Sequence, residues 1–228
     1  MVLLLFGPPG CGKGTQSPLL RDKLGIPAIS TGDMLRRESE KQSDTGRLID
    51  GLLADGRLVP DDMVNVLLES RLAEADCTNG FLIDGYPRTA EQASHLNHIL
   101  ECLNFAAPVM IHMDVPDLVL IGRLSARWCC PKCGAIYNVL SKPPAESGRC
   151  DLDGDMLCQR KDDTVQTAHR RLEAYKQITD PVLSYYTLPA VGQVIHVNAQ
   201  QTPDAVFEEI KLALETEVLP PIRLRRSS

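Results

Sequence analysis

A glycine-rich stretch near the start of the chain, Gly7-Pro8-Pro9-Gly10-Cys11-Gly12-Lys13-Gly14-Thr15, carries the residue types that bind phosphate groups. It follows an apolar run at residues 2–6 and precedes a helical pattern at 14–24, the usual setting of a phosphate-binding loop. Glycines let consecutive backbone N–H groups face one anion, the helix N-terminus adds a positive dipole, and Lys13 supplies a cation. The usual pattern places Ser or Thr directly after the lysine, whereas here Gly14 intervenes before Thr15. The stretch predicts a nucleoside triphosphate ligand and leaves the reaction open.

Asp84 ends a second apolar run, residues 81–83, and so stands where a carboxylate can reach a metal bound to the phosphates. Because Mg²⁺ keeps several of its waters, a nearby carboxylate can orient the ion through those waters. We therefore predict Mg²⁺, bound with the nucleoside triphosphate, as a cofactor that Asp84 holds through water.

Two cysteine-containing segments, Cys130-Pro131-Lys132-Cys133-Gly134 and Cys150-Asp151-Leu152-Asp153-Gly154, share one layout. Each has two possible ligands separated by two residues and followed by a glycine that lets the turn close. Disulfides are the alternative, but an intracellular protein is not expected to form them. Cys158 is the rival of Asp153, and the shared layout favours Asp153. The pattern predicts a closed, structural zinc site, with the ligands Cys130, Cys133, Cys150 and Asp153.

Composition narrows the class of protein. The 228 residues carry a net charge of −6 and only 4% aromatic residues, which argues against a nucleic-acid-binding protein. The chain has neither a signal-peptide pattern nor an apolar run long enough for a membrane helix, so we expect a cytoplasmic protein with no membrane partner. Cys77 and Cys102 are predicted to be small core residues, and the basic tail at residues 223–226 a solvated end.

Strand-like and helical patterns alternate along the chain. Strands are expected at residues 2–6, 26–29, 81–84, 109–113 and 194–197, and helices at residues 14–24, 60–75, 89–103, 116–127, 164–186 and 203–217. Such alternation predicts an α/β fold, a parallel sheet covered on both faces, with ligands at the carboxyl ends of the strands. Two segments depart from it: a polar helical stretch at 30–55, expected to cover little core, and a part rich in Cys, Pro and Gly at 128–160.

Several segments in register resemble the signature segments of adenylate kinases. These segments are residues 7–15, 30–36, 84–89 and 160–163, together with Gln92 and Arg171. The resemblance implies a P-loop NTPase-like core (1–29, 60–126 and 164–228) with a parallel sheet flanked by helices. It also implies a helical arm that binds the nucleoside monophosphate (30–59) and a small, zinc-bearing, β-type lid (127–163).

The resemblance also assigns the nucleotide contacts. For AMP it implies Thr31, Arg36, Arg57, Leu58, Val59, Gly85, Tyr86, Pro87, Arg88, Gln92, Arg160 and Arg171. For ATP it implies Gly10, Cys11, Gly12, Lys13, Gly14, Thr15, Arg123, Arg127, Ile136, Tyr137 and the backbone near Gln200. The catalytic residues it implies, all cations that neutralise phosphate charge, are Lys13, Arg88, Arg123, Arg127, Arg160 and Arg171.

The activity implied by the resemblance is reversible phosphoryl transfer from Mg-ATP to AMP, giving two ADP, by a monomer. A kinase for UMP or CMP is the nearest alternative, but such relatives generally have a short lid and often Ala at the position of Thr31. A zinc-ribbon ATPase that binds nucleic acid is a more distant alternative, and the negative net charge of the chain disfavours it.

Overall fold

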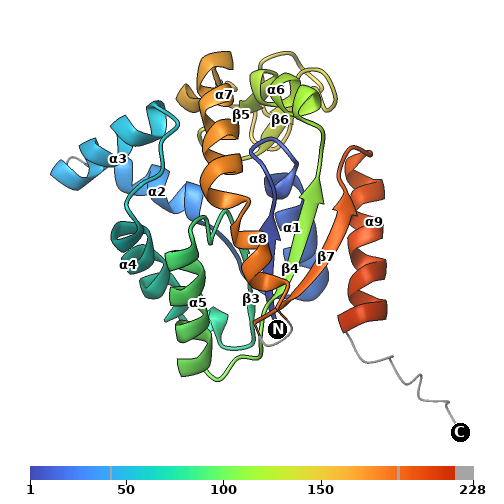
Figure 1. The fold of residues 1–228 in the computed structure, drawn as a ribbon. Helices are drawn as coiled ribbons and strands as arrows, with labels where there is room; N and C mark the ends of the chain where they lie inside the picture. The colour runs from blue at the N-terminus through green and yellow to red at the C-terminus, as the bar shows by residue number, and fades with distance from the viewer. Residues whose placement is uncertain (42, 189–190, 219–228) are drawn as a thin grey trace, which may run out of the picture.

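The structure, a computed structural model, describes residues 1–41, 43–188 and 191–218. Its centre is a five-stranded parallel sheet in the order β2 (Ala28–Ser30), β3 (Phe81–Asp84), β1 (Val2–Phe6), β4 (Val109–Asp114) and β7 (Gln193–Asn198) (Figure 1). All five strands agree with the predicted ones to within two residues at each end. The α/β class with a parallel sheet is confirmed.

Helices cover both faces of the sheet, which explains why β1 is apolar at every position. Val2, Leu4 and Phe6 join one apolar cluster, whereas Leu3 and Leu5 join the other. The first cluster is completed mainly by α4 (Asp61–Leu72), α5 (Ala90–Cys102) and α8 (Val182–Tyr186), and the second by α1 (Lys13–Leu24), α6 (Asp117–Ser125) and α9 (Pro203–Ala213).

The polar stretch after β2 forms α2 (Thr31–Ser39) and α3 (Asp44–Ala54), which project to one side of the sheet (Figure 1). The side chain of Ser30 caps α2 by accepting a hydrogen bond from the N–H of Asp33. Leu35 and Ile49 are buried in the same cluster as α4 and α5, so these helices cover more core than their polar composition suggested.

The region rich in cysteine folds into a small unit with its own two-stranded antiparallel sheet, β5 (Arg127–Cys129) and β6 (Ile136–Asn138). The helix predicted for 116–127 ends at Ser125, and Arg127 belongs to β5 instead. Only four residues of this unit form its buried cluster, namely Cys130, Tyr137, Cys150 and Leu157.

Two other predictions are corrected. The helix predicted for 164–186 is divided into α7 (Val165–Ala174), a π-helical turn (Tyr175–Thr179) and α8, because Pro181 has no N–H to continue the ladder. Cys77 is buried as expected, but Cys102 is exposed because it lies at the end of α5 on the side away from the sheet core.

The basic tail at residues 223–226 lies outside the described residues. Within the described ranges, none of the helices is both long enough and apolar enough to cross a membrane.

Candidate functional site

A cleft of about 1420 Å³ opens at the carboxyl ends of the parallel strands, between the helical arm and the cysteine-rich unit. It exceeds the roughly 300–1,000 Å³ of a typical site for one small molecule. Every residue that the sequence assigned to a nucleotide or to Mg²⁺ lines this one cleft. Segments far apart in the chain therefore meet there, as a parallel sheet requires.

The phosphate-binding loop leaves β1 and turns directly into α1. Gly10 and Gly12 have φ values of 87° and 112°, a region that glycine enters without a steric penalty. The first turn of α1 has neither a side-chain cap nor an acidic residue, so its N–H groups are available to an anion. Lys13 Nζ donates to the carbonyls of Gly7 (2.6 Å) and Pro8 (3.0 Å), which keeps the ammonium group at the loop.

Asp84 ends β3 beside the phosphate-binding loop. A Cβ atom placed on Gly14 would lie 3.9 Å from Asp84 Oδ2, and Thr31 Oγ1 donates to the Asp84 carbonyl at 3.2 Å. Burial raises the pKa of Asp84, against the charges of Lys13 and Arg88, which lower it. A carboxylate oxygen at this place fits the preference of Mg²⁺ for oxygen ligands and for water-mediated contacts.

Arginine side chains crowd the middle of the cleft. Burial is the main cause that lowers the pKa of Arg171 to about 10, and the charges of Arg127 and Arg88 lower it further. Burial and the charge of Arg36 likewise lower the pKa of Arg88, while Asp84 raises it. Among the described residues, Arg88 has no carboxylate partner within ion-pair distance. Because like charges at close range destabilise one another, the arrangement favours a bound polyanion.

Acidic residues that sequence reasoning left without a role hold two of these arginines. Asp163 is fully buried and accepts two hydrogen bonds from Arg127. Arg171 Nη1 lies 2.7 Å from Asp162 and 3.3 Å from Asp163. Burial lowers the pKa of Arg127, but the hydrogen bond to Asp163 and the negative charge of that carboxylate outweigh burial, so the net shift is upward. The two basic residues followed directly by two acidic residues at 160–163 were the sequence signal for this network.

Gln92, predicted to contact the purine, is buried and already engaged. Its Oε1 accepts from the N–H of Arg88 at 2.8 Å, and its Nε2 donates to Asp61 at 2.7 Å. One amide hydrogen and one lone pair remain for a ligand. Tyr86 is buried as well and donates to Asn65, so its role is to support this corner of the cleft.

Arg123 lies at the opposite side of the cleft, against the loop that follows β7. It donates to the carbonyls of Ala199 (3.0 Å) and Gln200 (3.4 Å), and the N–H of Gln200 donates to Asn198 Oδ1 at 3.1 Å. Both backbone groups of Gln200 are therefore engaged within the protein, and its predicted contact with the adenine stays a prediction.

The two cysteine-containing segments form turns with the same hydrogen bonds. The N–H of Gly134 donates to Cys130 and that of Gly154 to Cys150, at 3.0 and 2.9 Å. Both glycines have positive φ, at 77° and 73°, so the predicted role of glycine in closing each turn is confirmed. In each turn the N–H of the first cysteine also donates a hydrogen bond of 2.9 Å to the carbonyl of the residue five positions ahead, Ala135 or Asp155.

The turns bring together one ligand atom each from Cys130, Cys133, Cys150 and Asp153, all within 4.8 Å of one another. Cys133 Sγ and Cys150 Sγ are 3.5 Å apart, and Cys130 Sγ lies 3.4 Å from the Asp153 carboxylate. These separations are close to the edges of about 3.5–3.8 Å expected around a tetrahedral zinc ion. The backbone N–H of Asp155 lowers the pKa of Asp153 to about 2, which keeps the carboxylate charged.

Cys158, the rival fourth ligand, lies outside this group. Its backbone forms two hydrogen bonds of 2.9 Å with Cys129, and the Cys129 thiol donates to the Cys158 carbonyl at 3.5 Å. Tyr137, which was assigned to ATP, lines the cleft but packs its side chain beside Cys150 inside the small unit.

Comparison with known proteins identifies the family, because the family model for adenylate kinase matches residues 5–191. The chain belongs to the adenylate kinase family. It is 42% identical over 214 residues to the adenylate kinase of Methanosarcina acetivorans, covering 94% of this chain and 98% of the relative. It is 44% identical to that of Symbiobacterium thermophilum, with the same coverage. The adenylate kinase of Thermosipho melanesiensis is 41% identical over 210 residues, or 92% and 97% of the two chains. The resemblance stated from the sequence is confirmed.

Proposed function

We propose that this protein is an adenylate kinase that transfers a phosphoryl group reversibly from Mg-ATP to AMP, giving two ADP. The observation that carries the proposal is the single cleft, which joins the phosphate-binding loop at one end to the arm at the other. Its volume is sufficient for two nucleotides, and buried guanidinium groups lie between the two ends. Membership of the family supports the same reaction.

The protein contributes position and charge rather than covalent chemistry. The phosphate-binding loop and Lys13 bind the outer phosphates of ATP, while Arg36 and Arg88 bind the phosphate of AMP through paired N–H groups. Two phosphate chains facing each other repel, and fixed guanidinium groups offset that repulsion in the transition state. Mg²⁺ bound with ATP supplies further charge neutralisation, and Asp84 is positioned to accept hydrogen bonds from its waters.

We further propose that the arm (30–59) and the lid (127–163) close over the core (1–29, 60–126 and 164–228) when both nucleotides are bound. Closure excludes water, which would otherwise compete with AMP for the phosphoryl group. Ion pairs hold two of the cations at the hinge of the lid. Asp163 pairs with Arg127, and Asp162 pairs with Arg171. Bound phosphates then compete with the carboxylates for the same N–H groups.

The cluster of Cys130, Cys133, Cys150 and Asp153 is proposed to hold a structural Zn²⁺. Four donors, three of them thiolates, fit a closed tetrahedral site with no position for substrate. When bound, the ion cross-links the two turns and so compensates for an apolar cluster of only four buried residues. We also propose that the protein is cytoplasmic and monomeric. Light scattering of the purified protein measures its oligomeric state.

A coupled assay of ADP formed from ATP and AMP tests the reaction. Initial rates with AMP, CMP, UMP and GMP under one set of conditions then separate an adenylate kinase from a pyrimidine kinase. We expect AMP to react fastest, and a bisubstrate mimic with two adenosines joined by five phosphates to bind and inhibit. Faster turnover of CMP or UMP, or no affinity for the mimic, contradicts the proposal.

A further inference from the structure

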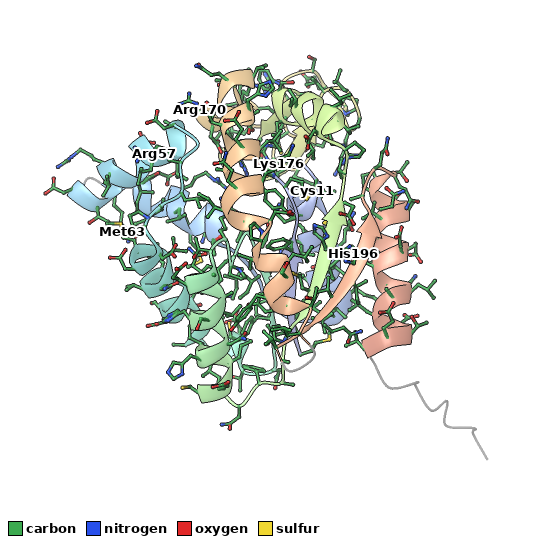
Figure 2. All side chains as sticks on the ribbon, in the orientation of Figure 1. Cys11, Arg57, Met63, Arg170, Lys176 and His196 are labelled. Atoms are coloured by element: carbon green, nitrogen blue, oxygen red, sulfur yellow. The ribbon has the colours of Figure 1, made fainter. Side chains whose placement is uncertain are left out.

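Three metal-ligating side chains lie together at the sheet edge, away from the lid. His112 and Asp114 are two residues apart on β4, so their side chains project from the same face of the sheet. His196 on β7 is the register partner of His112, which brings the two imidazoles side by side. The alternate residues Ile111 and Met113 enter the apolar cluster on the opposite face. Figure 2 shows His196 on β7, across β4 from the arm that carries Arg57.

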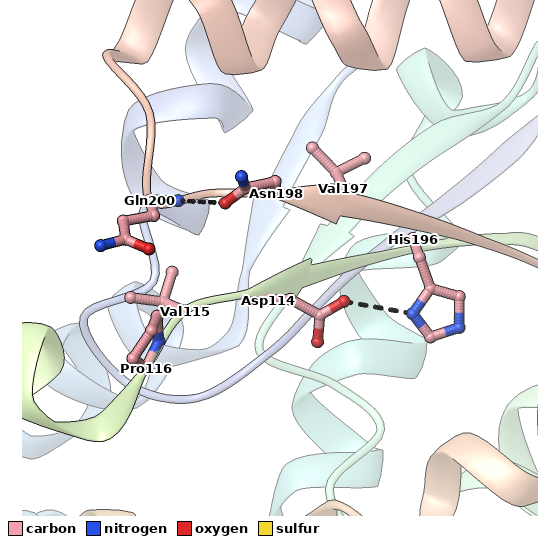
Figure 3. Close-up of a pocket in the computed structure, with 7 residues that line it drawn as sticks. All are labelled: Asp114, Val115, Pro116, His196, Val197, Asn198 and Gln200. Atoms are coloured by element: carbon pink, nitrogen blue, oxygen red, sulfur yellow. Dashed lines mark hydrogen bonds and ion pairs between the residues drawn. The ribbon is translucent and has the colours of Figure 1, made fainter.

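One ligand atom from each of these three residues lies within 4.8 Å of the others. His112 Nδ1 lies 3.2 Å from His196 Nδ1 and 3.4 Å from Asp114 Oδ1. His196 Nδ1 lies 3.2 Å from Asp114 Oδ2, a contact that Figure 3 shows as a dashed line. Donor atoms bound to one tetrahedral zinc ion at 2.0–2.1 Å would be separated by about 3.3 Å. Hydrogen bonding alone explains these contacts less well. The 3.4 Å between His112 Nδ1 and Asp114 Oδ1 exceeds the usual hydrogen-bond range, and one imidazole nitrogen must act as donor to the other.

We propose that His112, Asp114 and His196 form a second metal site, for a divalent transition-metal ion of which Zn²⁺ is the best fit. Two imidazoles and a carboxylate are donors that suit zinc and its neighbours in the first transition row, and suit Mg²⁺ and Ca²⁺ poorly. The site is independent of the proposed function, since it shares no residue with the nucleotide contacts or with the lid cluster.

The surroundings make this an open site. His112 is buried, whereas the side chains of Asp114 and His196 are 54% and 59% exposed, so an ion can enter from solvent. Asn198 lies next on the same face of β7, but its Oδ1 accepts a hydrogen bond from the N–H of Gln200. The fourth position is therefore left to water, as in three-ligand zinc sites.

An ion at this site would cross-link the edge strand β7 to β4. Among the strands that the structure describes, β7 pairs with β4 alone, and both strands end directly beside the site. β7 leads into the loop whose carbonyls receive Arg123, so the ion would also limit the movement of that side of the cleft. We expect bound metal to raise the melting temperature, because a ligand that binds only the folded state stabilises it.

Metal content of the full chain tests the proposal. The purified protein is stripped with a chelator, dialysed against Zn²⁺ and measured for bound zinc and melting temperature. The variants are His196→Gln, Cys130→Ser and the control His169→Gln, which changes an exposed histidine of α7. We expect His196→Gln to lose one equivalent of zinc relative to the wild type, and Cys130→Ser to lose a different one. The control should keep the content of the wild type.

Titration with Co²⁺ assigns each loss to a donor type. Thiolate ligands give intense charge-transfer absorption, which Cys130→Ser should abolish and His196→Gln should leave unchanged. The proposal is overturned if folded His196→Gln binds as much metal as the wild type, or if His169→Gln loses as much as His196→Gln. It is also overturned if all zinc bound by the wild type disappears in Cys130→Ser. Circular dichroism of each variant checks the fold, and the exposure of His196 leads us to expect no change.

Discussion

The sheet-bearing core and the lid keep their binding groups in place by different means. In the core, the phosphate-binding loop is fixed because β1 is buried between two large apolar clusters and α1 packs into the second of them. Its binding groups are backbone N–H dipoles, whose positions follow directly from the fold. In the lid, the apolar cluster has four buried residues with Trp128 and Ala135 packed against it. Two cysteine turns and the buried pair of Arg127 with Asp163 provide the remaining order.

This difference implies that the two regions fail separately. A change in the core loop removes phosphate binding but leaves the packing of the sheet intact. A change in the lid alters local stability first and catalysis second, because the lid has too little apolar surface to tolerate the loss of a cross-link. The following predictions test that separation.

Lys13→Ala should reduce catalysis strongly without lowering the stability of the fold. Within the described part of the chain, the ammonium group forms hydrogen bonds only with loop carbonyls and the Cys11 thiol, so its loss should leave the fold unchanged. Without the cation at the outer phosphates, kcat/KM should fall by about 10³-fold or more. Lys23→Ala, at the exposed end of the same helix, is the matched control for steady-state kinetics and melting temperature. A large drop in melting temperature for Lys13→Ala would contradict the view that the core loop affects phosphate binding without affecting stability.

Asp163→Ala should be the most destabilising change at the junction of lid and core. It leaves Arg127 buried without its carboxylate, and loss of one partner of a buried ion pair costs about 3–5 kcal/mol. Urea unfolding measures the cost, with Asp44→Ala, whose side chain is 98% exposed, as the control. Adding Arg127→Met to Asp163→Ala should restore part of the loss, because no buried charge then remains.

Cys130→Ser tests whether coordination orders the lid. We expect the loss of one equivalent of zinc and a destabilisation of about 2 kcal/mol, equal to about 4–8 °C in melting temperature. Cys102→Ser, at an exposed cysteine of α5, should change neither quantity. Unchanged zinc content in Cys130→Ser would show that the lid is ordered without metal.

The contribution of Asp162 to stability should depend on pH. Burial raises the pKa of Asp162, but the charges of Arg171 and Arg127 outweigh it and the net shift is downward. A carboxyl whose pKa is lowered by folding stabilises the protein above its unfolded pKa of about 3.9, and this stabilisation is lost as the pH falls through the folded value. The difference in unfolding free energy between wild type and Asp162→Asn should therefore shrink from pH 7 toward pH 3. A difference that grows on acidification contradicts the assignment.

Arg47→Ala should have the smallest effect, although its side chain lies within hydrogen-bond range of Asp44 on α3. Both side chains are largely exposed, at 69% and 98%. Exposed pairs of this kind contribute about 0.5 kcal/mol or less, so urea unfolding should barely distinguish the variant from the wild type. A cost above about 1 kcal/mol would mean that the arm, like the lid, depends on ion pairs.

Local patterns in the sequence were sufficient for the sheet, the phosphate-binding loop and the cysteine turns. Each depends on neighbours in the chain: continuous apolar runs, glycines at fixed spacing, and two cysteine-containing segments of one layout. The break near Pro181 and the exposure of Cys102 were missed, because helical periodicity alone specifies neither a π-turn nor which helix face meets the sheet.

By itself, the sequence determined which residues could bind phosphate and metal, since the donor atoms of a side chain and short-range spacing are local properties. Only the tertiary structure decided which donors meet. The register of β4 with β7 placed His112 beside His196, and the return of the chain after the lid buried Asp163 against Arg127. Such contacts join residues 84 and 36 positions apart, and their geometry depends on how the sheet and the lid pack together.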